Sequence, residues 1–132
     1  MEGKILINDA PMVLMGASAE PIGSMHLLVY GGSDDILFNQ LEEYGLLILR
    51  ETNDSIRQQL IQKRNKILNN HPGFSKKILA YNTITKKWFE HANLDSKIPV
   101  TALSFQHEDN FIIVSGELSP GIRTPQIQKF YN

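Results

Sequence analysis

The feature that most constrains the fold is a pair of similar segments far apart in the chain. "HLLVYGGSDD" begins at His26 and "NFIIVSGELS" begins at Asn110, and each is an apolar run followed by small residues and an acid. Apolar runs rich in Val, Ile, Tyr and Phe and ended by glycine are typical of β-strands. Gly32 and Gly116 close the two runs and lie 84 residues apart. The chain therefore contains a β unit that occurs twice.

A helical insertion explains the long spacing. The segment 34–73 opens with Asp34 and Asp35, which suit a helix N-terminus. A second helix follows, which Asn53 or Asp54 can cap. The expected apolar faces are Ile36, Leu37, Leu41, Tyr44 and Leu47 on the first helix, and Ile56, Leu60, Ile67 and Leu68 on the second. Without this segment the spacing matches the roughly 40–50 residues of a propeller repeat.

The remaining segments have the texture of strands. We expect strands at 4–7, in the stretch 12–23 with a turn at Pro21 and Gly23, and at 25–30, 79–81, 88–89, 100–105, 111–114 and 124–132. In the strand at 25–30, the residues on both faces are largely apolar, which predicts that both faces are covered. The predicted fold is mainly β: one unit, 1–132, of about two propeller blades, with the helical hairpin 34–73 inserted.

Composition excludes several classes of function. The net charge is −1, so no overall field attracts nucleic acid or an anionic membrane. There are no cysteines, which removes disulfides, thiolate zinc sites and cysteine nucleophiles. No apolar run approaches the roughly 18–20 residues of a membrane span, and the N-terminus lacks the features of a signal peptide. The basic run Lys63–Lys66 has no interleaved aromatic residues and is expected to be a solvated helix face.

The strand ending in Gly31-Gly32, followed by Tyr81 and Trp88 with six residues between them, resembles the kelch repeat. Glycines permit a tight exit from a strand, and the Tyr and Trp pack between neighbouring blades. The second repeat departs from the pattern, because Ser115-Gly116 replaces the glycine pair.

The stretch "SGELSPGIRTP" extends the resemblance. With the helical insertion and the return at "LAYNTITKKW", its residues Gly116-Glu117, Pro120-Gly121 and Arg123-Thr124 resemble the N-acetylneuraminate epimerase (sialic acid mutarotase) family, including cyclically permuted members. The resemblance runs from about Met15 to Lys129. It implies a closed six-bladed kelch propeller, of which this chain supplies about two blades, an isomerase that interconverts sialic acid anomers, and a periplasmic or secreted location in bacteria.

Glu117 and Arg123 are the candidate catalytic residues. Mutarotation opens and recloses a hemiketal ring, which needs a base for the anomeric hydroxyl and an acid for the ring oxygen; no cofactor or metal is required. By the resemblance Glu117 is the proton acceptor. A guanidinium suits the sugar carboxylate, so Arg123 either binds that carboxylate or orients Glu117. From spacing alone, a surface ion pair of little energetic value is the better explanation of the two residues; the resemblance to the family favours the site.

Other polar residues are weaker candidates. Asn39 and Glu42 on the first helix are candidates for facing the propeller mouth, with Asn39 as a substrate-binding residue. The four histidines show no metal-ligand spacing: His26 is expected in the core, and His71 and His107 in loops. Asp34 and Asp35 are better explained as helix caps than as a site.

A rival function comes from another class: a kelch module that binds a protein partner and catalyses nothing. For the enzyme, the expected partner is a small sugar acid, with no nucleic acid and no membrane. Two blades leave strand edges uncovered, so we also expect self-association or missing blades supplied from elsewhere.

Overall fold

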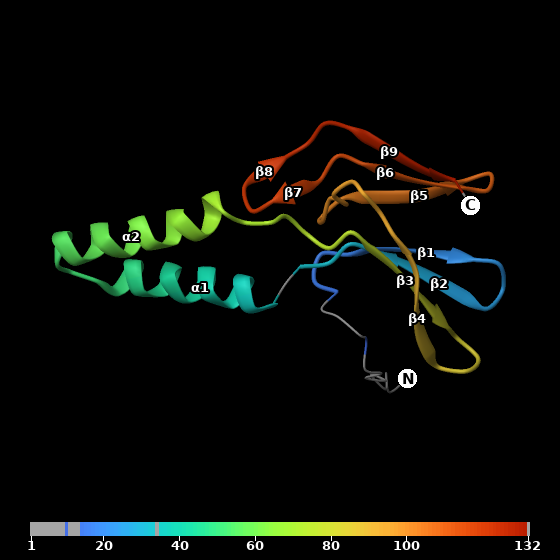
Figure 1. Cartoon of the computed structure of the whole chain (residues 1–132), viewed down its shortest axis with the longest axis horizontal. Coiled ribbons are helices and arrows are strands. Elements are labelled where there is room, and N and C mark those ends of the chain that lie inside the picture. Colours follow the sequence, from blue (N-terminus) through green and yellow to red (C-terminus); the bar gives the residue numbers. More distant parts are fainter. Residues whose placement is uncertain (1–9, 11–13, 34, 132) are drawn as a thin grey trace, which may run out of the picture.

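The computed structural model describes residues 10, 14–33 and 35–131. Two groups of strands lie side by side, and a pair of antiparallel helices projects from one end of them (Figure 1). The prediction of a mainly β chain, a partial propeller with a helical hairpin, is confirmed. The strand expected at 4–7 and the carboxylate of Asp34 fall outside the described residues.

The first sheet has the antiparallel order β1-β2-β3-β4, the four-stranded form of a propeller blade. Its strands are β1 (Ser18–Ile22), β2 (His26–Tyr30), β3 (Lys77–Asn82) and β4 (Lys87–Asn93). Pro21, expected in a turn, instead pairs with Leu27 inside β1. Because β1 is an edge strand, a proline without an N–H group is tolerated there. The turn comes later, at Gly23, which has φ 58°.

The second sheet has the order β5-β6-β9 and is followed by a small hairpin, β7-β8. These strands are β5 (Leu103–His107), β6 (Asn110–Val114), β7 (Glu117–Ser119), β8 (Ile122–Arg123) and β9 (Ile127–Tyr131). The strand expected from residue 100 begins later, at Leu103, because Val100 forms an isolated bridge with Glu117. His107, expected in a loop, is the last residue of β5 and pairs with Asn110.

The core lies between the two sheets. Its members come from β2, β3, β6 and the segment before β5: Leu28, Tyr30, Ile78, Ala80, Ile98, Phe111 and Ile113. Tyr30 packs against Phe111 and Phe130, with ring centroids 5.6 and 5.7 Å apart. Burial, and secondarily the charge of Glu20, raises the pKa of Tyr30 far above its usual range. The expected cover on β2 is incomplete, because Leu27 is exposed near the outer end of the strand.

The two repeats leave their strands with the same backbone conformation. Gly31 and Gly32 have φ of 73° and 113°, and Ser115 and Gly116 have 60° and 110°. Both glycine carbonyls then accept a bond from the returning chain, Gly32 from Ser75 N at 3.0 Å and Gly116 from Thr124 N at 2.9 Å. The second exit is crowded: a Cβ on Gly116 would lie 2.8 Å from atoms of three neighbouring residues. Glycine is therefore required at 116, and Ser115 accepts a conformation that glycine adopts more easily.

The helices α1 (Asp35–Arg50) and α2 (Asp54–Asn69) connect β2 to β3. Of the two cap candidates for α2, Asn53 is the cap: its side chain accepts bonds from Ser55 N at 3.0 Å and Ile56 N at 3.2 Å. The predicted apolar faces are only partly covered, since Leu41 is the one buried residue on α1 and α2 has none. The hairpin projects away from the sheets, so the helices mainly cover each other (Figure 1).

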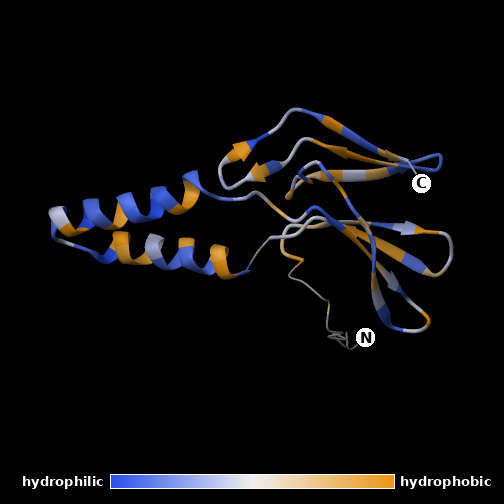
Figure 2. Ribbon diagram, viewed as in Figure 1, coloured by the Kyte–Doolittle hydropathy of each residue, from blue (hydrophilic) through white to orange (hydrophobic). Residues whose placement is uncertain are grey.

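Figure 2 shows the contrast in hydropathy: hydrophobic residues follow β2 and β6, whereas most of α2 is hydrophilic. Within the described ranges, no helix has both the length and the apolar character needed to cross a membrane.

Candidate functional site

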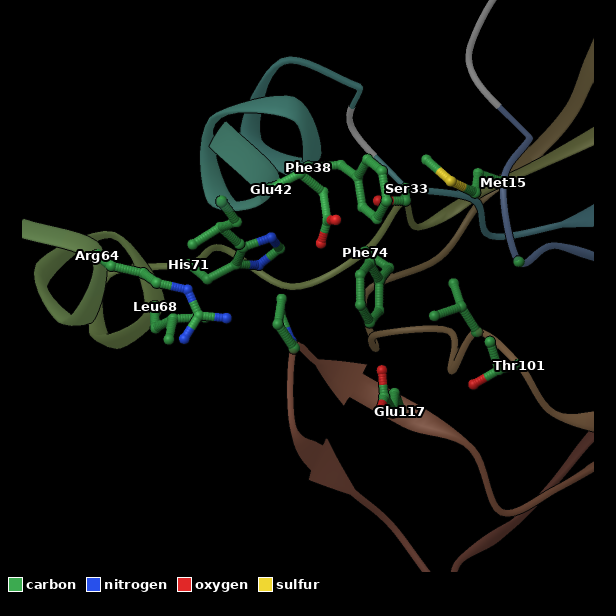
Figure 3. A pocket seen from close by; sticks show the side chains of 14 residues that line it. Met15, Ser33, Phe38, Glu42, Arg64, Leu68, His71, Phe74, Thr101 and Glu117 are labelled. Carbon is green, nitrogen blue, oxygen red and sulfur yellow. The ribbon is translucent and has the colours of Figure 1, made fainter. Parts of the chain in front are cut away.

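A cavity of about 210 Å³ lies where the helical hairpin meets β7 and the loops at the ends of the sheets (Figure 3). Its apolar wall includes Phe38, Leu41, Leu68 and Phe74. Its charged and imidazole side chains are Glu42, Arg64, His71 and Glu117. Such a cavity, apolar with a few polar groups that converge on it, is the usual form of a small-molecule site.

Glu117, the predicted base, lies in this cavity. It is the first residue of β7, and its backbone is fixed by two 2.9 Å hydrogen bonds, Glu117 N to Val100 O and Val100 N to Glu117 O. Its side chain is 30% exposed, which leaves the carboxylate partly shielded yet accessible. In Figure 3 it enters from the β7 side, across the cavity from the helices.

Ser33 occupies the corresponding position in the first repeat. Ser33 N donates to Met15 O at 3.2 Å, as Glu117 N donates to Val100 O. Both Ser33 and Glu117 line the cavity. The cavity therefore lies at equivalent ends of the two β units, and only the second unit places a carboxylate there.

Arg123 lies beside Glu117 and outside the residues that line the cavity. The two residues are register partners in the β7-β8 hairpin. Arg123 Nη1 is 4.0 Å from Glu117 Oε1, and the Arg123 side chain is 58% exposed. A pair this long and this exposed contributes little to stability, so the chain brings the predicted pair together by strand register rather than by a strong ion pair.

The two candidates on α1 have different environments. Phe38, Leu41 and Glu42 follow the i, i+3, i+4 spacing of one helix face and line the cavity. Asn39 is exposed and is not among the cavity-lining residues. The helix turn that directs Glu42 toward β7 therefore directs Asn39 elsewhere.

Arg64 and His71 line the cavity, although the sequence pattern assigns neither to a site. The basic run predicts that Arg64 lies on a solvated face, yet Arg64 is half-buried while Lys63 and Lys66 are exposed. The signal was present: position 64 falls on the apolar side of α2, four residues from both Leu60 and Leu68. His71 lies in a loop, as expected, and its Nδ1 accepts a bond from Gly73 N at 3.0 Å. In the neutral ring the proton is therefore on Nε2.

His26 does not line this cavity. It is the first residue of β2 and is half-buried, with its Nε2 3.1 Å from Asn82 Nδ2. Across residues 10, 14–33 and 35–131, no three histidine or carboxylate side chains gather in a way that could hold a metal ion.

No protein-family model matches this chain. A search of curated proteins likewise finds no match. Among solved structures, that of YjhT has a similar fold, with a TM-score of 0.70 and 19% sequence identity. The alignment covers 95% of this chain and 38% of YjhT. The likeness establishes the fold of almost the whole chain, and the chain spans well under half the length of YjhT.

Proposed function

We propose that this chain carries the proton-transfer site of a sialic acid mutarotase, which interconverts the α and β anomers of N-acetylneuraminate. The observation that carries the proposal is the position of Glu117. The residue that the resemblance to the epimerase family assigns as proton acceptor lies half-buried on the wall of the cavity, with Arg123 as its strand partner. The likeness of the fold to YjhT supports the same propeller architecture.

The chemistry follows from the residues. The carboxylate of Glu117 takes the proton of the anomeric hydroxyl, the bond between the anomeric carbon and the ring oxygen breaks, and the proton taken by Glu117 passes through a water molecule to the ring oxygen. The open ketone then recloses on its other face, with each proton transfer reversed. General acid–base assistance of this kind accelerates such a step by roughly 10²–10⁴-fold. The shielded position of Glu117 keeps its carboxylate near the substrate and away from bulk water.

The test is NMR of freshly dissolved α-anomeric N-acetylneuraminate, with and without the protein. We expect the α signals to decay faster in proportion to protein concentration, at concentrations where the chain is associated. A decay equal to that in buffer, from protein shown by light scattering to be associated, would overturn the proposal. It would favour the rival, a non-catalytic kelch module that binds a protein partner.

A further inference from the structure

The second helix of the insertion supplies a positive group to the cavity that the proton-transfer chemistry does not use. Arg64 extends from α2 into the cavity beside Leu68, and Glu117 enters the same cavity from β7 (Figure 3). Its Nε is buried and has no hydrogen-bond partner among the described residues. A buried N–H group without a hydrogen-bond partner lowers stability. Such an unpaired group is expected where a bound ligand supplies the missing partner.

The other arginine of α2 shows what a structural role looks like. Arg57 donates from Nε to Glu51 O at 3.1 Å, and its Nη1 lies 3.2 Å from Asp54 Oδ1. Arg57 thus ties the α1–α2 connection to the first turn of α2. Arg64 has no ion pair with any described residue, although Glu42 lines the same cavity.

We propose that Arg64 binds the carboxylate of the sugar acid, so that the helical hairpin supplies the anion-binding part of the site and β7 the proton-transferring part. This inference rests on the proposed mutarotase function. A planar guanidinium with free N–H groups matches a carboxylate in a two-point hydrogen-bonded pair. Phe38 and Phe74 form apolar walls of the same cavity, against which the body of a sugar can pack.

The arrangement also assigns different roles to the two arginines. Arg123 is more than half exposed, lies outside the cavity lining and is the strand partner of Glu117. Arg123 is therefore a positioning residue for the Glu117 carboxylate, while Arg64 contacts the substrate carboxylate from the helical wall.

The experiment compares binding of N-acetylneuraminate with binding of its uncharged methyl ester, by NMR titration of the full chain. Four proteins are used: the wild type, Arg64→Ala, Arg64→Lys and the control Lys63→Ala. Lys63→Ala removes the same charge from the neighbouring, exposed position outside the cavity. We expect the wild type and Lys63→Ala to bind the acid about 10- to 100-fold more tightly than the ester, the range expected of a hydrogen bond to a charged group. Arg64→Ala should bind both equally, and Arg64→Lys should keep part of the preference.

The outcomes separate this inference from the function on which it rests. If Arg64→Ala keeps the full preference for the acid, or Lys63→Ala loses it equally, Arg64 does not bind the carboxylate, and the mutarotase proposal stands on its own assay. If the preference depends on Arg64 but no protein accelerates anomer exchange, the anion site stands and the mutarotase function fails. If the wild type binds neither compound, the anion site is refuted as well.

Discussion

At the scale of single residues, the two members of the predicted pair, Glu117 and Arg123, have different positions relative to the cavity. Glu117 and Arg123 are six positions apart, and strand register places them opposite each other in β7-β8. Yet only Glu117 lines the cavity. Arg64, more than fifty positions away in the sequence, lines the helical wall of the same cavity. The two arginines are therefore expected to respond differently to substitution.

Glu117→Gln is the first test of the mechanism. Glutamine has the same shape but cannot accept a proton, so we expect the rate of anomer exchange in the associated protein to fall by roughly 10²-fold or more. The backbone bonds to Val100 do not involve the side chain, so the melting temperature should stay nearly unchanged. An unchanged exchange rate would remove Glu117 from the mechanism.

Arg123→Lys tests the positioning role. Lysine keeps the charge but loses the planar fork, so we expect kcat for N-acetylneuraminate to fall while the preference for the acid over its methyl ester is kept. The kinetics are measured by NMR exchange and the preference by titration. A selective loss of acid binding would instead show that Arg123 grips the carboxylate.

At the scale of elements, the exit from β6 is the most constrained turn next to the site. Gly116 has φ 110°, its position is crowded by Pro99, Val100 and Ala102, and it directly precedes Glu117. Gly121 also has a positive φ, 77°, but a Cβ there would meet nothing within 4 Å. Substitutions at Gly116 and Gly121 therefore distinguish the cost of backbone strain, present at both, from the cost of steric crowding, present only at Gly116.

We expect Gly121→Ala to lower the free energy of unfolding by about 1 kcal/mol, the cost of a left-handed conformation. Gly116→Ala should cost at least about 3 kcal/mol, because strain and steric overlap add. Urea denaturation of the two variants gives the comparison. Equal losses would mean that the strand exit relaxes freely.

The helical hairpin is expected to open more readily than the sheets. No residue of α2 is buried, whereas Ile78, Leu79 and Ala80 of β3 are almost completely so. Segments with few buried apolar contacts open locally at low free energy. Amide hydrogen exchange should therefore be faster in the middle of α2 than in β3, and saturating N-acetylneuraminate should slow exchange in α2 if Arg64 binds it. Equal protection of the two elements without ligand would contradict this expectation.

At the scale of the whole molecule, the second sheet has exposed apolar side chains. Among residues 10, 14–33 and 35–131, the first sheet has four strands and the second has three, in the order β5-β6-β9. On β9, Ile127 and Tyr131 are 67% and 80% exposed. Because alternate side chains of a strand point to the same face, Ile127 and Tyr131 mark an exposed apolar face of the sheet, which a neighbouring blade covers in a propeller. We therefore propose that the chain associates through this face, with about three copies approximating a six-bladed ring.

Light scattering across a dilution series measures the degree of association. We expect the apparent mass to exceed the 15.0 kDa of one chain and to fall toward it on dilution, with mutarotase activity lost in the monomer. Ile127→Lys should weaken association by placing a charge on this face. Ile84→Lys is the control, since Ile84 is equally exposed, at 68%, but lies in the β3–β4 turn. A stable monomer with full activity would refute both the association and the need for further blades.

The sequence by itself determined the local features of this protein. Glycine placement and strand texture located both β units, which leave their strands with the same left-handed backbone conformation at Gly31-Gly32 and Ser115-Gly116. Helix periodicity located the hairpin, and Asn53 caps α2 because its side chain reaches backbone N–H groups two and three residues ahead. These features depend on neighbours in the chain, so a pattern of residue types is enough to find them.

Only the tertiary structure decided what the site contains. Pro21 entered a strand because β1 lies at a sheet edge, and Val100 left β5 because Glu117 offered it a partner. Arg64 belonged to a basic run by sequence, and became a cavity residue because the hairpin sets that face of α2 on the cavity that β7 also lines. Each outcome depends on contacts between segments distant in the chain. Residue types near a position do not encode which distant segment will cover it.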